Sequence, residues 1–78
     1  MWQIKYSQEV RNYIFDSYPY TAQVWAAIKT LRSSVNGLPP GNYRELDPDL
    51  ILWTIAGHEV IYQRLNHLLY ITVVKPQE

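Results

Sequence analysis

The spacing of hydrophobic positions changes twice along the chain. Residues 2–6 alternate apolar and polar side chains, as in a strand with one buried face. From residue 8 to residue 37 the apolar positions recur at helical spacing, and beyond residue 42 this spacing does not return. The pattern therefore predicts a strand, then a helical region, then a second region of strands.

Two helices are predicted in the helical region. The first begins after Ser7, an N-cap residue type, and ends before Pro19, which disfavours helical backbone in the residue ahead of it. The second begins after Thr21, and Gly37 is expected to end it in a left-handed conformation. The apolar stripe of the second helix has its members at Val24, Ile28, Leu31 and Val35.

β-Branched and aromatic residues dominate the chain beyond the loop at residues 38–42. Strands are predicted at residues 50–55, 58–65 and 68–74, with a short additional one at residues 43–46. The last three are joined by two-residue connections of hairpin length. We therefore expect an α+β fold in a single domain: an N-terminal strand, a two-helix hairpin, and an antiparallel meander of three to four strands packed on the helices.

Strands of the meander carry apolar residues at consecutive positions, so that both faces of the sheet are apolar. Two short helices cover one face only, and a large exposed apolar patch usually marks an interaction site. Leu52, Trp53 and Tyr70 are therefore the candidate partner-binding residues. The alternative is that neighbouring strands and the chain ends cover this face. The expected core residues are Ile4, Tyr6, Val10, Ile14, Val24, Ile28, Leu31, Val60, Tyr62, Ile71 and Val73.

Composition narrows the class of protein. Of the 78 residues, 47% are hydrophobic, which excludes a disordered chain, and no run approaches the ~20 apolar residues of a membrane span. There is no cysteine, so disulfides and thiolate chemistry are excluded. The first twenty residues are too charged for a secretory signal, and a cytoplasmic location is expected.

Seven basic residues balance seven acidic ones, and the formal net charge is zero. Domains that bind nucleic acid usually carry a basic excess, so any such binding here has to come from a local patch. A net charge of zero also favours association, with a partner or as a homo-oligomer.

Groups that could carry chemistry are few. His58 and His67 lie at opposite ends of one predicted strand, ~30 Å apart at ~3.3 Å per residue, which is too far to share a metal ion. We expect no metal site and no cofactor, since nucleotide- and metal-binding motifs are also absent from the sequence. His58 beside Glu59 is a candidate acid–base pair, although a histidine at a hairpin more commonly has no chemical role.

Two segments of the meander carry a family likeness. They read Gly-His-Glu-Val-Ile-Tyr-Gln-Arg at residues 57–64 and Ile-Thr-Val-Val-Lys-Pro at residues 71–76. Together with the order of elements over the whole chain, they resemble the RelE/ParE family, the toxins of type II toxin–antitoxin systems. The resemblance implies an intracellular toxin that is neutralised by a cognate antitoxin. Some members cleave mRNA on the ribosome, and others poison DNA gyrase.

The mRNA-cleaving branch uses basic residues on the open face of the sheet and a group that moves protons. Glu59 stands where arginine usually precedes Val-Ile-Tyr, and Lys75 matches the late basic position. Arg64 could add positive charge, and His58 could act as an acid. The resemblance therefore implies Glu59, Arg64, Lys75 and His58 as candidate catalytic residues.

Three functions are compatible with these residues. The first is a toxin-like component bound and neutralised by an antitoxin, either gyrase-directed or catalytically weakened, because Glu59 and the zero net charge disfavour RNA cleavage. The second is a ribosome-dependent mRNA endonuclease, with Glu59, Arg64, Lys75 and a histidine as its chemical groups. The third is a non-toxic protein-interaction module that keeps the same fold.

Overall fold

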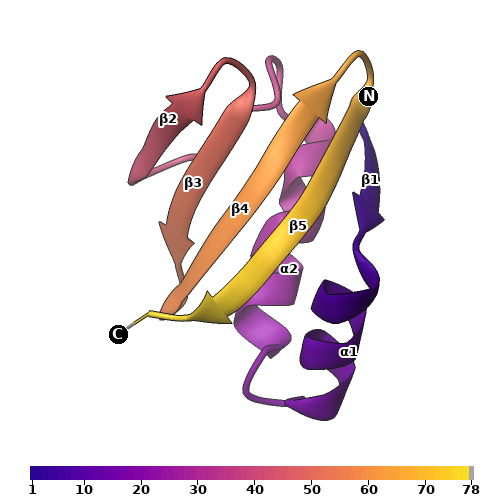
Figure 1. Cartoon of the computed structure of the whole chain (residues 1–78), viewed down its shortest axis with the longest axis vertical. Helices are drawn as coiled ribbons and strands as arrows, with labels where there is room; N and C mark the ends of the chain where they lie inside the picture. The colour runs from indigo at the N-terminus through magenta and orange to yellow at the C-terminus, as the bar shows by residue number, and fades with distance from the viewer. Residues whose placement is uncertain (78) are drawn as a thin grey trace.

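The structure is a computed structural model that describes residues 1–77. A single five-stranded sheet forms one layer, and two helices cover one of its faces (Figure 1). Among the described residues, no helix is long and apolar enough to cross a membrane. The elements in chain order are β1 (Gln3–Tyr6), α1 (Gln8–Asp16), α2 (Ala22–Thr30), a 3₁₀ turn (Leu31–Ser33), β2 (Tyr43–Asp47), β3 (Leu50–Ile55), β4 (His58–Leu65) and β5 (Leu68–Pro76).

The strands lie in the order β1-β5-β4-β3-β2. Strands β2 to β5 form an antiparallel meander, whereas β1 pairs with β5 in parallel, so the first and last strands are neighbours. The predicted α+β fold is confirmed, and its meander has four strands. The parallel position of β1 beside β5 follows from no local pattern and was not predicted.

The predicted start of the first helix is confirmed. The second helix also begins after Thr21, but without the predicted side-chain cap. Ser7 is the N-cap of α1, and its Oγ accepts a hydrogen bond from the Val10 N–H over 3.2 Å. Thr21 precedes α2, but its hydroxyl does not cap that helix. It is buried and donates to the Ile14 carbonyl over 2.6 Å, so it joins the two helices to each other.

The end of the second helix differs from the prediction. Helix α2 ends at Thr30 and continues only as the 3₁₀ turn, so Val35 lies outside the helix and is fully exposed. Gly37 has the expected positive φ of 74°, but it lies in the following loop. A Cβ at this position would come within 2.8 Å of Trp2 Cζ2 and 3.0 Å of Arg64 Cδ, so close packing and backbone conformation both favour glycine.

The core lies between the helices and the sheet. Most of the predicted core is buried, with Ile4 and Tyr6 partly buried against it. Val73 is an exception, because the pairing of β4 with β5 shifts register between Ile61 and Tyr62 and turns Val74 to the core in its place. The buried apolar residues are Val10, Ile14, Val24, Ile28, Leu31, Ile51, Trp53, Val60, Tyr62, Leu69, Ile71 and Val74.

Candidate functional site

The sheet face opposite the helices carries a continuous set of apolar side chains, which we call the open face. It is turned toward the viewer in Figure 1, with both helices behind the sheet. None of its residues belongs to the buried core, and Leu65 and Tyr70 are 45% and 36% exposed. The apolar members are Leu50, Leu52, Ile61, Leu65, Leu68, Tyr70 and Val73.

Strand register brings the centre of the open face together. Leu52 of β3 lies opposite Ile61 of β4, which in turn lies opposite Val73 of β5. Side chains at directly opposed positions of neighbouring strands are in contact distance, so these three residues form one row across the sheet. A contiguous apolar patch that a small domain leaves open is typical of a protein-binding surface.

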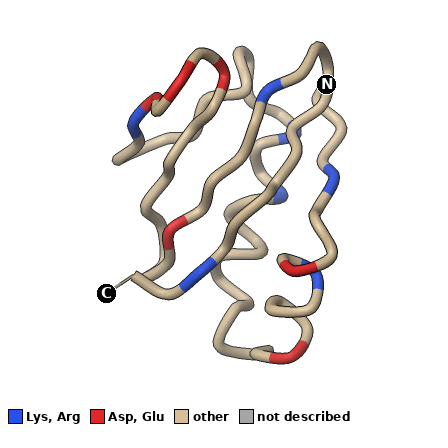
Figure 2. Tube along the Cα trace, in the orientation of Figure 1, with Lys and Arg blue, Asp and Glu red and all other residues tan. Residues whose placement is uncertain are grey.

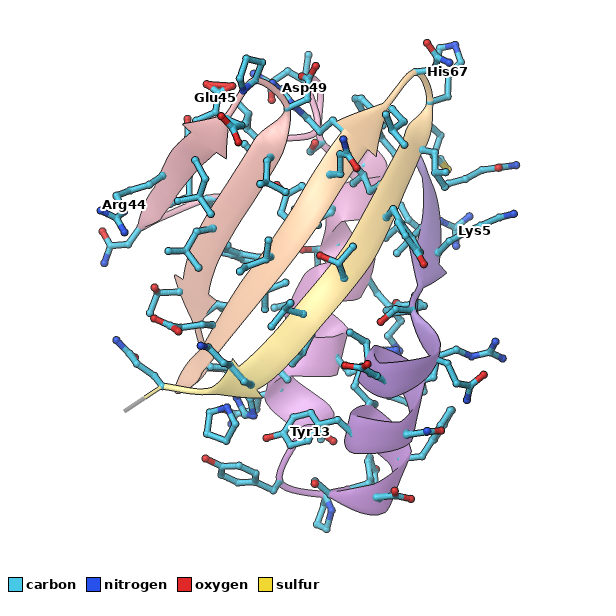
Figure 3. The ribbon with its side chains drawn as sticks, viewed as in Figure 1. Lys5, Tyr13, Arg44, Glu45, Asp49 and His67 are labelled. Atoms are coloured by element: carbon cyan, nitrogen blue, oxygen red, sulfur yellow. The ribbon has the colours of Figure 1, made fainter. Side chains whose placement is uncertain are left out.

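Polar residues surround this row. Arg44 lies opposite Leu52 on the outer strand β2, and Lys5 lies opposite Tyr70 on β1. Figure 3 shows Arg44 and Lys5 at opposite outer edges of the sheet. An apolar centre with a polar rim is the usual composition of a protein–protein interface.

Glu59 and Lys75, two of the candidate catalytic residues, meet on the open face. Strand register places them opposite each other, and Lys75 Nζ lies 3.6 Å from Glu59 Oε1. The Lys75 side chain is 60% exposed and that of Glu59 is 32% exposed. This pair forms part of the polar rim, and the carboxylate offsets the lysine's positive charge.

Arg64 lies on the other face of the sheet, five residues further along β4 and ~17 Å from Glu59 at ~3.3 Å per residue. Its Nη2 lies 3.0 Å from Asp49 Oδ1 and 3.6 Å from Glu45 Oε2, and its Nη1 donates to the Asn36 carbonyl over 2.8 Å. The guanidinium therefore ties the β2–β3 turn and the loop after α2 to the sheet. Two carboxylates compensate its charge.

His58 is fully buried and points toward the helices. Its Nδ1 lies 2.9 Å from the Ala56 carbonyl, which can only accept, so Nδ1 is the donor of this hydrogen bond. Nε2 is hydrogen-bonded to the Tyr13 hydroxyl over 2.9 Å, and the centre of the Tyr20 ring lies 5.1 Å from that of the imidazole. Burial, and secondarily the neighbouring Tyr20, raise the pKa of Tyr13. Both ring nitrogens of His58 are thus hydrogen-bonded, and the imidazole connects α1 to the start of β4.

The four candidate catalytic residues occupy three separate places. Only Glu59 and Lys75 are together, while His58 and Arg64 face the helices at opposite ends of β4. His67 is exposed in the β4–β5 turn, at the far end of the strand from His58 (Figure 3). In residues 1–77, no group of three or more His, Asp or Glu side chains is placed to hold a metal ion.

The structure corrects one of the three candidate partner-binding residues. Leu52 and Tyr70 are on the open face, but Trp53 is 1% exposed and its indole N–H donates to the Pro40 carbonyl over 3.0 Å. Successive residues of a strand alternate between faces, so Leu52 and Trp53 cannot both reach a partner. Ile61 and Val73, which complete the central row, were not singled out from the sequence.

No family model, curated protein or solved structure matches this chain. The likeness to RelE/ParE toxins therefore rests on the sequence segments and on the order of the elements.

Proposed function

We propose that this protein is a RelE/ParE-like component of a toxin–antitoxin pair and that its open face binds the cognate antitoxin. The observation that carries the proposal is the apolar row of Leu52, Ile61 and Val73 across three adjacent strands. The order of strand, helical hairpin and meander supports the family assignment, and so does the position of the two family-like segments on the neighbouring strands β4 and β5.

The open face indicates what such a partner presents. The centre of the partner's binding surface needs apolar side chains, since burial of the row of Leu52, Ile61 and Val73 supplies most of the binding free energy. The margin of the partner's binding surface needs polar groups that pair with the Glu59–Lys75 ion pair and with Arg44, because a buried charge left without a partner weakens binding.

The same geometry favours binding over RNA cleavage. Cleavage by a 2′-hydroxyl requires a base, charge stabilisation at phosphorus and an acid at the leaving oxygen. Glu59 and Lys75 are together, but the lysine is paired with the carboxylate and the other two candidates face the helices. A gyrase-directed or catalytically weakened toxin therefore fits better than an efficient mRNA endonuclease.

Inducible expression in a bacterial host tests the proposal. We expect growth arrest that is relieved by co-expression of the cognate antitoxin, for which small reading frames next to the gene are the first candidates to test. Cut ribosome-bound messages that disappear in Lys75→Ala would indicate an endonuclease, whereas altered DNA supercoiling would indicate a gyrase-directed toxin. Unimpaired growth, together with no binding to any of these candidates, would overturn the assignment.

Two matched variants test the binding face. Leu52→Lys should weaken antitoxin binding by tenfold or more, because it places an unpaired charge within the apolar row. Gln23→Lys adds the same charge at an exposed position of α2, on the opposite side of the molecule, and should leave affinity unchanged. Isothermal titration with purified antitoxin measures both, and equal affinities for the two variants would exclude the open face as the binding site.

A further inference from the structure

A groove runs beside the free edge of β1. Gln3 and Ser7 donate their backbone N–H groups to carbonyls at the β5 side, so the alternating backbone groups of Ile4 and Tyr6 point away from β5. The groove lies between this edge and α2 and has a volume of about 520 Å³. Its lining residues are Trp2, Gln3, Ile4, Lys5, Tyr6, Trp25, Lys29 and Arg32.

The groove continues toward the first helix. Tyr6 lines it together with two smaller hollows, one that adds Arg11 and one that adds Phe15 from α1. The combined surface therefore extends from the end of α2, along β1, to the middle of α1.

Positive charge is concentrated along this groove. Four of the seven basic residues of the chain line it, and no Asp or Glu lines it among residues 1–77. These four side chains are exposed, and none of the salt bridges in the described part of the chain involves them. Figure 2 shows basic positions on β1 and the helices, while an acidic cluster lies at the β2–β3 turn. The four are Lys5, Arg11, Lys29 and Arg32.

Aromatic rings form the wall between these charges. Trp2 is held in place by its indole N–H, which donates to the Ser34 carbonyl over 3.1 Å, and it remains partly exposed. Trp25 contacts the exposed Phe15 edge to face, with ring centres 5.7 Å apart. Lys29 Nζ lies 4.5 Å from the centre of the Trp25 ring, so cation and aromatic surface occur side by side.

Unpaired cations interleaved with accessible aromatic rings are the combination that binds single-stranded nucleic acid. The cations contact phosphates and the rings stack on bases, without sequence readout. An acidic peptide would use the charges and the free strand edge, but it would leave the aromatic surface without a matching flat partner. The two tryptophans therefore favour a nucleic acid over a peptide.

We propose that the β1–α2 groove binds a short single-stranded stretch of RNA or DNA. A strand of four residues spans ~13 Å, which with the extension onto α1 accommodates about four nucleotides, the lower end of the range for one small domain. This site shares Lys5 with the rim of the open face but includes none of the apolar residues of that face. The proposal does not depend on the proposed antitoxin partner.

Fluorescence anisotropy with labelled oligouridine and oligothymidine of about twelve nucleotides tests the proposal. We expect binding at low salt whose affinity falls with salt concentration, with a logarithmic slope of about −0.7 per phosphate contacted, or about −2 to −3 for three to four contacts. Stacked bases should also quench the fluorescence of Trp2 and Trp25, while the buried Trp53 stays unquenched. Comparison of the two oligonucleotides shows whether the 2′-hydroxyl contributes.

Charge reversal locates the site. Arg32→Glu should weaken oligonucleotide binding several-fold, and its combination with Lys29→Glu should weaken it by about tenfold or more. Arg44→Glu makes the same change at an exposed arginine of β2 and should leave binding unchanged. Because all three side chains are exposed, thermal melts should be unaltered.

Three results would overturn the proposal. They are no binding at low salt, an equal loss of affinity in Arg44→Glu and Arg32→Glu, and binding of an oligoglutamate of the same length as tightly as the oligonucleotides. The last result would assign the groove to acidic peptides. Leu52→Lys tests the groove separately from the open face. This variant should retain oligonucleotide binding whether or not the open face binds an antitoxin.

Discussion

Tyr62 joins the centre of the sheet to the loop after α2 through its hydroxyl group. The ring is fully buried, and the hydroxyl donates to the Gly37 carbonyl over 2.8 Å. Burial raises the pKa of Tyr62 well above the usual range for tyrosine, and the nearby charge of Arg64 opposes this only in part. The folded protein therefore holds this proton at pH values where an unfolded chain loses it.

We expect the free energy of unfolding to fall as the pH rises above about 10, the pKa of an exposed tyrosine. Above this pH the unfolded state binds fewer protons than the folded state, so ionisation stabilises the unfolded chain. Tyr62→Phe should flatten this decline. At neutral pH it should reduce stability by about 1 kcal/mol, because the Gly37 carbonyl loses its donor. Urea unfolding followed by tryptophan fluorescence from about pH 8 to 11 measures both effects.

Tyr18→Phe is the matched control, because it removes a hydroxyl from a tyrosine that is 60% exposed. Its unfolding curves should follow those of the unsubstituted protein across the pH range. If the free energy of unfolding of Tyr62→Phe fell with rising pH as steeply as that of the control, the buried Tyr62 hydroxyl would not be the cause of the pH dependence.

Leu52 and Trp53 show why the open face was only partly predictable at the level of single residues. A run of consecutive apolar residues does not reveal which of two neighbours faces the helices. Strand β4 carries that information, because its polar Glu59 and Gln63 indicate that Val60 faces the core. Trp53 lies opposite Val60, so the pairing of the strands decides its burial.

At the scale of elements, local patterns predicted the strands and the helix starts well, and long-range pairing accounts for most of the errors. The register shift between Ile61 and Tyr62 exchanges the roles of Val73 and Val74. Thr72 lies at this irregularity, and its hydroxyl donates to the Ile61 carbonyl over 3.2 Å. Such a bulge depends on both strands, and the sequence of one strand does not disclose it.

Helix α2 is attached to the sheet by its buried stripe, and its true end can be tested with two variants. Ile28→Ala should reduce the free energy of unfolding by about 2–5 kcal/mol, since Ile28 is fully buried. Val35→Ala removes a β-branched side chain that is fully exposed and should change stability by less than about 0.5 kcal/mol. Chemical denaturation of both gives the comparison. Similar losses would mean that the helical stripe continues to Val35.

For a chain of 78 residues the Ile28→Ala loss is severe, because net stability is about 4–12 kcal/mol at this size. The expected loss therefore approaches the whole stability of the fold at its lower limit. Binding of a partner to the folded state alone would offset it in proportion to partner concentration.

At the scale of the whole molecule, an apolar face is combined with a net charge of zero. No element within residues 1–77 covers this face, and a net charge of zero gives little overall repulsion between copies. We therefore expect concentration-dependent self-association in the absence of a partner. Leu52→Lys should shift the protein toward the monomer in sedimentation velocity experiments, and Gln23→Lys should not. A protein that stays monomeric at several hundred micromolar would contradict this expectation.

The parallel pairing of β1 with β5 has a consequence for synthesis on the ribosome. Ser7 Oγ donates to the Thr72 carbonyl, 65 positions later, and the Gln3 N–H donates to the His67 carbonyl. Strand β1 leaves the ribosome before β5 and therefore waits for β5 before its backbone is paired on either side. Until then the nascent chain exposes a short strand edge with unpaired backbone groups. Pairing of β1 with β5 joins residues far apart in the sequence, so we expect it to form late and to slow folding.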